Sequence, residues 1–530
     1  MHFSIISDNW IPVLYKDGSE ATISLRTAFL TAESIKDISE ESCMEKLGII
    51  RLLCVFFMDI YRPERKKDRL EYLETNFNMD LFDSYVSECE KKGTSFNLFD
   101  NTNPFMQTGI LKSEKGMAIK YSPVSRINDF DCSGDELVFF GGKNETDYTY
   151  TPAKCMRLLC QKTCTVIKNK AGQGYKSFAP LQNAIFMLRM GNCLKETIVY
   201  NSTSKKEWEN FNPSIKYGTE DGCNGPTWKQ GILKDEGQKY CPMELSLLQL
   251  MTYVPIYIKF IPNKDGTVHE CYYTGRNFKR SDKETENEKE PFLLYKDPMI
   301  IINKSMNKDG LLSERPERFN PDSGFWETLE AVSISNVDIT ENSTKHVSKP
   351  LVITGLDPSE SYRVEVWTTC QDGNGKGVVY NESVEISDAV FGAEAETVQG
   401  EVLSISKIIN GLRKDKKISS NFTPSSNKLF SLCLTQIIKD QKSYMSSDFM
   451  KNYIPNVNEL IKTDYRAVVA YKKEYFEKTV EMLKEIALSR LDKINGNYDI
   501  LTKKMGCKKA LYSYYKNILE GDRCDIKRKD

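Results

Sequence analysis

Residues 459–494 read ELIKTDYRAVVAYKKEYFEKTVEMLKEIALSRLDKI, and their apolar side chains recur every three or four positions. That spacing places the apolar side chains on one face of an α-helix. Lys472 and Thr479 interrupt this face without breaking its period. We therefore predict one long helix, packed into a core through Ile461, Tyr465, Val468, Val469, Phe476, Val480, Leu483, Ile486 and Ala487.

The same helical spacing continues on both sides of this stretch. It predicts further helices at about residues 400–412, 426–444 and 498–520. Four helices joined by loops are typical of a helical bundle. We place the domain junction near residues 390–400, which gives an N-terminal domain of residues 1–395 and a C-terminal four-helix bundle of residues 396–530.

The N-terminal domain mixes helical and strand patterns. Alternating apolar and polar residues predict an initial hairpin, with strands at 3–6, 11–14 and 21–24. Helical spacing follows over residues 26–61, before Pro63, and again over 66–90. Later strand candidates are 253–260, 299–302 and 362–368. The expected fold class is therefore α+β, with a large mixed α/β N-terminal domain.

Composition and charge exclude several classes of protein. The 530 residues include 73 Lys and Arg against 74 Asp and Glu, a formal net charge of -1, so any nucleic-acid binding must come from local patches. The longest apolar stretch, residues 47–61, contains Arg51 and Asp59, which indicates a buried helix and no membrane span. Scattered cysteines, 15 in all, and a start without signal-peptide features predict free thiols and a cytoplasmic location.

The sequence lacks the usual signatures of catalysis. Its three histidines stand in no metal or triad spacing, and no C-x-x-C pair or complete phosphate-binding glycine loop occurs. Cys155, Cys160 and Cys164 lie close in sequence, and a packed core is the preferred interpretation of their spacing. We therefore expect no enzyme activity, no metal and no cofactor.

One stretch is typical of a nucleic-acid contact. No acidic residue lies between Asp147 and Glu196. The basic residues of this stretch are Lys154, Arg157, Lys162, Lys168, Lys170, Lys176, Arg189 and Lys195. Near its centre, Gly172 and Gly174 would let backbone amides approach a phosphate or a groove. The alternative is a solvated basic loop that binds nothing.

Two further segments could contact nucleic acid. Residues 364–380 predict a hairpin whose tip, Gly373, Asn374, Gly375 and Lys376, is narrow and polar. Such a tip can enter a minor groove or separate base pairs, although an ordinary surface hairpin has the same pattern. Residues 273–280 form a short basic and aromatic patch ending in Lys279 and Arg280, which is equally consistent with a plain turn.

Several motifs together resemble a known family. Asp8-Asn-Trp-Ile-Pro-Val, Asn103-Pro-Phe-Met-Gln-Thr, Pro226-Thr-Trp and Tyr273-Thr-Gly resemble, in order and spacing, motifs of the CasA family, the large subunit of the type I-E CRISPR Cascade surveillance complex. The resemblance covers nearly the whole chain, including its length and helical C-terminus. It implies an N-terminal domain of unusual fold and a subunit that catalyses nothing.

The resemblance also implies partners: CRISPR RNA, other Cascade subunits, double-stranded target DNA and a recruited helicase-nuclease, with no membrane. In such subunits a glycine loop, a basic contact and a wedge hairpin read the protospacer-adjacent motif and open the duplex for R-loop formation. Here these elements correspond to Gly172, Gly174 and Lys176; to Lys279 or Arg280; and to Gly373, Asn374, Gly375 and Lys376. The family often has glutamine at the wedge tip, where this chain has Gly375.

A fourth loop, at Phe139, Phe140 and Gly141, corresponds to the one that touches the CRISPR RNA end and the neighbouring backbone subunit. The family sometimes has a zinc-binding cysteine cluster before Tyr-Thr-Gly, but this chain has only Cys271 nearby, so we predict no zinc. Two alternatives stay open. One is a structural subunit that binds the CRISPR RNA end without reading the motif. The other is an unrecognised nuclease, against which the lack of metal-ligand spacing argues.

Overall fold

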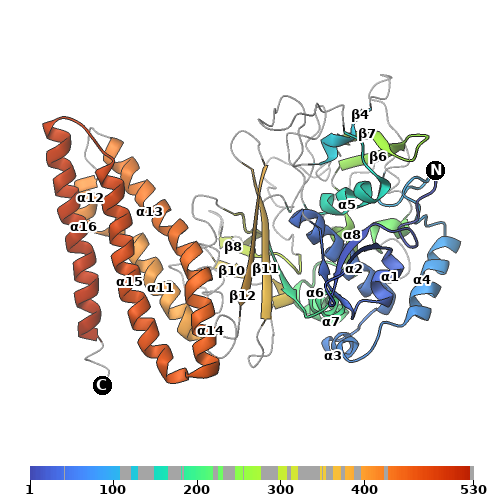
Figure 1. The fold of residues 1–530 in the computed structure, drawn as a ribbon, viewed down its shortest axis with the longest axis horizontal. Helices are drawn as coiled ribbons and strands as arrows, with labels where there is room; N and C mark the ends of the chain where they lie inside the picture. The colour runs from blue at the N-terminus through green and yellow to red at the C-terminus, as the bar shows by residue number, and fades with distance from the viewer. Residues whose placement is uncertain are drawn as a thin grey trace. The chain divides into compact units, whose positions relative to one another are not determined.

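The computed structural model describes residues 1–40, 42–107, 121–128, 148–164, 181, 184–218, 225–230, 245–254, 256–275, 297–306, 312–319, 346–348, 350–353, 362–371, 377–386, 395–422 and 428–525. The chain divides into two compact units (Figure 1). Unit 1 comprises Met1–Arg318, Lys349–Thr354 and Val364–Ser383; unit 2 comprises Phe319–Ser348, Gly355–Arg363 and Val384–Asp530. The junction that we place at residues 395–396 stays a prediction.

Unit 1 begins with a small antiparallel sheet of order β2-β1-β3. Its strands are β1 (Ile11–Tyr15), β2 (Glu20–Ile23) and β3 (Ile35–Ile38). The hairpin predicted at 11–14 and 21–24 is confirmed, but the strand predicted at 3–6 is wrong, since only an isolated bridge joins Ser4 to Asn97. The helix predicted over 26–61 is also interrupted, because β3 forms a ladder with β1 between α1 (Leu25–Leu30) and α2 (Cys43–Tyr61).

Helix α2 forms the centre of unit 1. Nearly all of its side chains are buried, as expected for a helix that is apolar on every face. It packs against α4, α5, α6 and α8. The helices around it are α3 (Lys66–Leu70), α4 (Met79–Lys91), α5 (Pro152–Lys162), α6 (Leu194–Asn201), α7 (Lys205–Phe211) and α8 (Leu247–Thr252). The buried helix expected from residues 47–61 is thus confirmed.

Two more sheets belong to unit 1, of orders β4-β7-β6 and β12-β11-β5, and β8 pairs with β9 in a hairpin. The strands are β4 (Ser122–Pro123), β5 (Ile185–Met190), β6 (Ile256–Pro262), β7 (Val268–Gly275), β8 (Ile302–Met306), β9 (Leu312–Pro316), β11 (Tyr362–Gln371) and β12 (Gly377–Ile386), the last two mainly in unit 1. Strand β10 (His346–Ser348) belongs to unit 2. Single 3-10 turns lie at η1 (Glu71–Leu73), η2 (Val124–Ile127), η4 (Thr227–Gln230) and η6 (Leu351–Ile353). The strand predicted at 253–260 begins three residues later, because Tyr253 caps α8.

Unit 2 contains the predicted C-terminal bundle. Its four long helices are α11 (Ala395–Lys414), α13 (Lys428–Asp448), α15 (Tyr465–Asp492) and α16 (Tyr498–Asp525). Short helices α12 (Lys416–Phe422) and α14 (Ile454–Thr463) lie between them, and a short π-helix (Phe449–Tyr453) joins α13 to α14. The predicted α+β fold, with a mixed N-terminal part and a helical C-terminal part, is confirmed.

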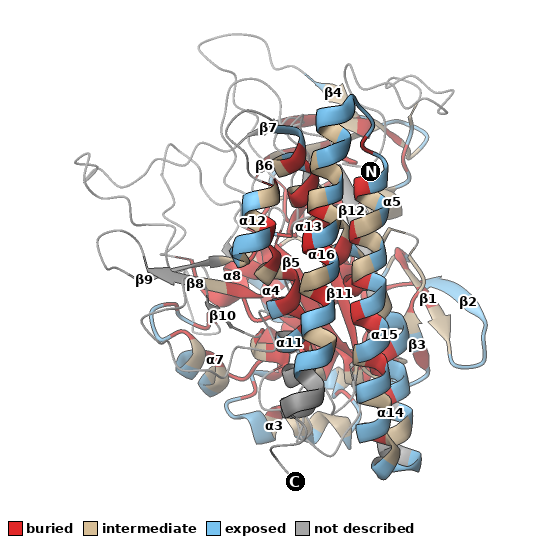
Figure 2. Ribbon diagram, turned by 90° about the vertical axis from the view of Figure 1, so that its left-hand side faces the viewer, coloured by how far each residue is buried: buried red, intermediate tan, exposed pale blue. Residues whose placement is uncertain are grey.

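The apolar stripe of residues 459–494 is only partly as predicted. Val468, Val480, Leu483 and Ala487 are buried, as Figure 2 shows by the alternation of red and pale blue along α15. Val469 is 73% exposed, so the prediction that it lies on the buried face is wrong. Two helices replace the single predicted one, because Asp464, with φ -151° and ψ 84°, breaks the backbone between α14 and α15.

Candidate nucleic-acid interface

All predicted contact residues lie outside the part of the chain that the structure describes. They are Gly172, Gly174, Lys176, Lys279, Arg280, Gly373, Asn374, Gly375, Lys376, Phe139, Phe140 and Gly141. The structure instead describes the strands and helices at which each predicted loop begins and ends, and these belong to unit 1. These described strands and helices form the frame of the candidate site.

The predicted glycine loop follows α5 in the chain. The hydroxyl of Thr151 accepts a hydrogen bond from the Lys154 amide and caps α5, and Pro152 occupies the first turn, where a missing N–H costs nothing. The helix lies against α2, and Gly48 of α2 makes the contact possible: a Cβ there would be 2.4 Å from the carbonyl carbon of Cys160. The end of α5 is thereby fixed.

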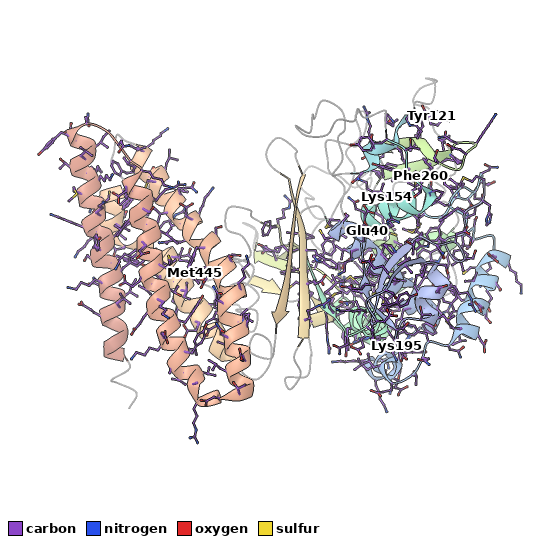
Figure 3. The ribbon with its side chains drawn as sticks, in the orientation of Figure 1. Glu40, Tyr121, Lys154, Lys195, Phe260 and Met445 are labelled. Atoms are coloured by element: carbon purple, nitrogen blue, oxygen red, sulfur yellow. The ribbon has the colours of Figure 1, made fainter. Side chains whose placement is uncertain are left out.

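A cluster of charges ties α5 to α2 from the side. The Lys154 ammonium lies 2.5 Å from a Glu45 oxygen, and the Arg157 guanidinium lies 2.6 Å from Glu40 and 3.5 Å from Glu45. Figure 3 shows Lys154 and Glu40 close together. Burial raises the pKa of the Glu45 carboxyl, and the charge of Lys154 opposes that rise. The two cations therefore offset part of the cost of burying this carboxyl group.

The described members of the acid-free run are engaged within the fold. Besides Lys154 and Arg157, Lys195 is paired with Glu33, and the Arg189 guanidinium carbon lies 3.5 Å from the ring centroid of Tyr200. Lys162 is fully buried. Acidic residues are absent from this run in sequence but not around it in space. The other basic residues of the run, Lys168, Lys170 and Lys176, lie outside the described residues.

The base of the predicted wedge hairpin is a pair of neighbouring strands. Strands β11 and β12 flank residues 372–376 and are adjacent in the sheet, with β5 on the other side of β11. Trp367 of β11 is fully buried, and the Lys46 ammonium lies 5.7 Å from its ring centroid and 3.3 Å from Glu365. The hairpin predicted for residues 364–380 is confirmed in its strands, while its tip stays a prediction.

Gln107 of the Asn103-Pro-Phe-Met-Gln-Thr motif supports the β6–β7 hairpin. The Gln107 side chain accepts a hydrogen bond from the Phe260 amide at 2.8 Å and donates one to the Leu98 carbonyl at 2.7 Å. Strand β7 ends at Gly275, just before the predicted contacts Lys279 and Arg280. Tyr273 of β7 is 4% exposed, so its ring is packed inside unit 1 and is not available to stack on a base.

A polar network that sequence reasoning missed holds the Pro226-Thr-Trp motif. The Trp228 indole donates to the Tyr85 hydroxyl at 2.9 Å, which donates to Asp59 at 2.6 Å. Lys229 completes it with an ion pair to Asp59 at 2.8 Å, although 170 positions separate the two residues. The Trp228 ring stacks on Phe56 at 4.5 Å and lies 5.6 Å from Phe105. Two motifs far apart in sequence thus meet in one cluster, which is structural in character.

The thiols of the described residues have the environment of core packing. Cys155, Cys160 and Cys164 are buried, as the preferred interpretation of their spacing predicted. Burial also raises the pKa of the Cys164 thiol to about 11, so this thiol is not a ready metal ligand. Within the described ranges no group of three His, Cys, Asp or Glu side chains could hold a metal ion. No helix in these ranges is both long enough and apolar enough to cross a membrane.

Comparison with known proteins assigns a family. The family described as CRISPR-associated protein Cse1 matches residues 5–429. Among solved structures, Thermobifida fusca Cse1 has a TM-score of 0.70 at 16% identity and covers 98% of each chain. Thermus thermophilus CasA (Cse1) has a TM-score of 0.66 at 15% identity, covering 97% of this chain and 99% of that one.

A chain of a CRISPR RNA-guided surveillance complex has a TM-score of 0.62 at 14% identity, covering 96% of this chain and 99% of that one. No curated protein matches the chain. The structural likenesses establish the fold, and the family match extends from the first predicted strands into the C-terminal helices. The resemblance found in the sequence is therefore confirmed, and the chain belongs to the Cse1 family of CRISPR-associated proteins.

Proposed function

We propose that this chain is the non-catalytic large subunit of a CRISPR RNA-guided complex. It would recognise the protospacer-adjacent motif in duplex DNA, wedge the duplex open for R-loop formation and recruit the helicase-nuclease. The observation that carries the proposal is the family match over residues 5–429, which includes every predicted contact loop. Support comes also from a chain of similar fold in a CRISPR RNA-guided surveillance complex. CRISPR RNA and the other Cascade subunits are the proposed partners, and the cytoplasm is the proposed location.

The described frame supports this proposal physically. A loop that reads DNA must be presented by a rigid base, because each contact is lost if the loop shifts with its support. The ion cluster of α5, the buried Trp367 of β11 and the Gln107 bonds to β6 provide such bases for three loops. Readout from the minor groove separates mainly A·T from G·C pairs, which suits a reader that tolerates several short motifs.

Opening the duplex requires little energy per step. Separating one base-pair step costs about 1.4 kcal/mol, and pairing with the guide RNA returns a similar amount. A wedge therefore only has to start the opening. The near-neutral charge of the chain, -1, limits unspecific binding to DNA during the search.

The test compares the RNA-guided complex with and without this chain, on duplexes that differ only beside the target, at one fixed salt concentration. Two variants change the predicted loops: Gly174→Asp, and replacement of residues 374–376 by a short turn. We expect each to weaken binding of the preferred duplex by about tenfold or more, since a wrong contact costs 1–3 kcal/mol. Assembly of the complex should be unchanged.

The matched control is Ser84→Asp, which adds the same charge on the exposed face of α4. It should leave DNA binding unaltered. If the chain confers no preference among flanking sequences, motif reading is wrong, and a structural subunit that binds the CRISPR RNA end remains. Cleavage of DNA by the chain alone with Mg²⁺ or Mn²⁺ would contradict the non-catalytic assignment.

A further inference from the structure

Two segments of unit 1 that are far apart in sequence meet and bring basic side chains together. The chain leaves α2 at Arg62 and enters α3, while α7 begins at Lys205. The backbone amides of Lys205 and Lys206 donate to the carbonyl oxygens of Pro63 and Glu64, both at 3.0 Å. The two segments are therefore joined along their backbones, and α3 and α7 lie near each other in Figures 1 and 2.

The two segments carry a strong excess of positive charge. Residues 62–69 and 204–207 contain seven basic and three acidic side chains, a local net charge of +4 in a chain whose total is -1. Arg69 is buried, and the other six basic residues are exposed or half-buried. We call these six the basic corner: Arg62, Arg65, Lys66, Lys67, Lys205 and Lys206. Such a local excess attracts a polyanion even when the whole chain is nearly neutral.

Two of the three carboxylates are bound within the fold, and the third, that of Glu64, is exposed. Asp68 accepts a hydrogen bond from the Arg65 amide at 2.9 Å at the start of α3. The Arg69 guanidinium donates to both oxygens of Glu207, at 3.0 and 2.9 Å. Burial by itself raises the pKa of the Glu207 carboxyl, but the hydrogen bonds and charge of Arg69 outweigh it and hold the pKa below its usual value. This ion pair fixes α3 to α7, so the basic corner has a rigid base.

Arg62 stands in a backbone conformation that does not favour arginine. It ends α2 with φ 44° and ψ 56°, in the left-handed region, where glycine or asparagine is the common residue. The side chain is exposed, and its Nε donates to the Asp59 carbonyl at 3.2 Å. Ending the helix does not explain an arginine at this position, and a contact of its charge with an anion supplies a reason for it.

The chemistry of the basic corner favours a duplex phosphate backbone over other polyanions. Among the described residues, none of the exposed large apolar side chains lies in residues 62–75 or 204–211. A protein interface usually has apolar or aromatic anchors, and a single-stranded nucleic acid stacks its bases on aromatic side chains. Contacts to the phosphates of a duplex need neither, because arginine and lysine supply them alone.

We propose that the basic corner binds the phosphate backbone of duplex DNA without reading its sequence. It is a second DNA contact, formed by residues 62–67 and 205–206 and separate in sequence from the predicted motif-reading loops. The proposal rests on the proposed function only in taking duplex DNA as the partner. A contact of this kind holds the chain on DNA while the loops test the flanking sequence.

The experiment measures the anisotropy of a short fluorescein-labelled duplex, without a target or preferred flanking sequence, titrated with the full chain at several salt concentrations. The corner variant is Lys67→Gln/Lys206→Gln. The matched control, Lys36→Gln/Lys91→Gln, neutralises two exposed lysines of β3 and α4. Each lost phosphate contact reduces the salt slope of log K by about 1, so the corner variant should reduce it by about 2 and weaken binding about tenfold at low salt. The control should change binding less than about twofold.

A second variant separates DNA binding from stability. Glycine adopts the left-handed conformation without strain, so Arg62→Gly should leave the thermal midpoint unchanged or raise it. The same change removes one cation, and it should weaken duplex binding about threefold and reduce the salt slope by about 1. A residue with a purely structural role does not combine an unchanged or raised midpoint with weaker binding.

Three results would overturn the proposal. They are no binding of the duplex by the full chain, equal losses in the corner and control variants, and a loss confined to single-stranded RNA or to polyglutamate titrated in the same way. The last would assign the basic corner to RNA or to an acidic protein. Failure of motif reading is measured separately in the assembled complex, because Gly174→Asp should change the preference among flanking sequences, whereas the corner variant should weaken binding of all duplexes equally.

Discussion

At the residue scale, the most informative side chain is Asp59. Its carboxylate is fully buried in α2, and it is compensated by one cation, Lys229, and one phenol, Tyr85. Lys229→Met should lower the free energy of unfolding by about 3 kcal/mol, because it leaves a buried charge with no opposite charge. Urea titration followed by tryptophan fluorescence measures this loss. The control is Lys206→Met at an exposed position of α7, which should have little effect.

The double variant Asp59→Asn/Lys229→Met separates the charge from the packing. The amide can still accept the Tyr85 hydrogen bond, so most of the lost stability should return. If the double variant is as unstable as Lys229→Met alone, the loss comes from the lysine side chain and its packing, and the interpretation of a buried ion pair is wrong.

At the scale of elements, the close contact between α2 and α5 holds the helix that precedes the predicted glycine loop. In an exposed helix, Gly→Ala stabilises by about 1 kcal/mol. At Gly48 the sign should reverse, since the added Cβ would lie 2.4 Å and 2.5 Å from the carbonyl group of Cys160. We expect Gly48→Ala to lower the thermal midpoint by several degrees and to weaken DNA binding by the assembled complex.

Gly521→Ala is the matched control for that change, because α16 has open space around this glycine. It should leave the midpoint unchanged or raise it slightly. A stabilising effect at both positions would show that α5 can move away from α2 without cost. The interpretation that α2 holds α5 rigidly before the predicted glycine loop would then be wrong.

At the scale of the whole molecule, the predicted junction at residues 395–396 can be tested with a fragment of residues 395–530. Its helices share a core: α11 packs on α12, α13 and α15, and α16 packs on α12 and α15. The Gln441 side chain joins three of them by donating to the Leu483 carbonyl at 2.6 Å and to Tyr515 at 2.5 Å. We expect the fragment to unfold cooperatively by circular dichroism. A gradual transition would show that the bundle needs residues before 395.

The sequence predicted helices and strands best where they follow from the spacing of apolar residues along the chain. Helical periodicity located α15, and the hairpin pattern of residues 364–380 located β11 and β12. The same reasoning placed Val469 inside, because a helical wheel alone does not say which edge of an apolar face a neighbouring helix covers. Asp464 does carry a sequence signal for the break, since aspartate is common at the position directly before a helix.

The frame of the candidate site could not be predicted in this way. Glu45 and Lys154 are 109 positions apart, and Asp59 and Lys229 are 170 apart. Such pairs exist only once the chain has folded, so neither charge counting nor motif spacing finds them. Phe105, Gln107 and Trp228, from two of the motifs that indicated the family, pack inside unit 1. The residues that we expect to touch DNA lie in other segments of the chain.

The pairing of Lys154, Arg157 and Lys195 with carboxylates has a consequence for mutational screens. An alanine scan of basic residues across this run would register lost target interference at these three positions, and a screen scored only on that phenotype would count them as DNA contacts. Their partners Glu45, Glu40 and Glu33 give the means to sort the hits. A position whose defect is reproduced by changing its glutamate belongs to the scaffold, and one whose defect is not is a candidate for the interface.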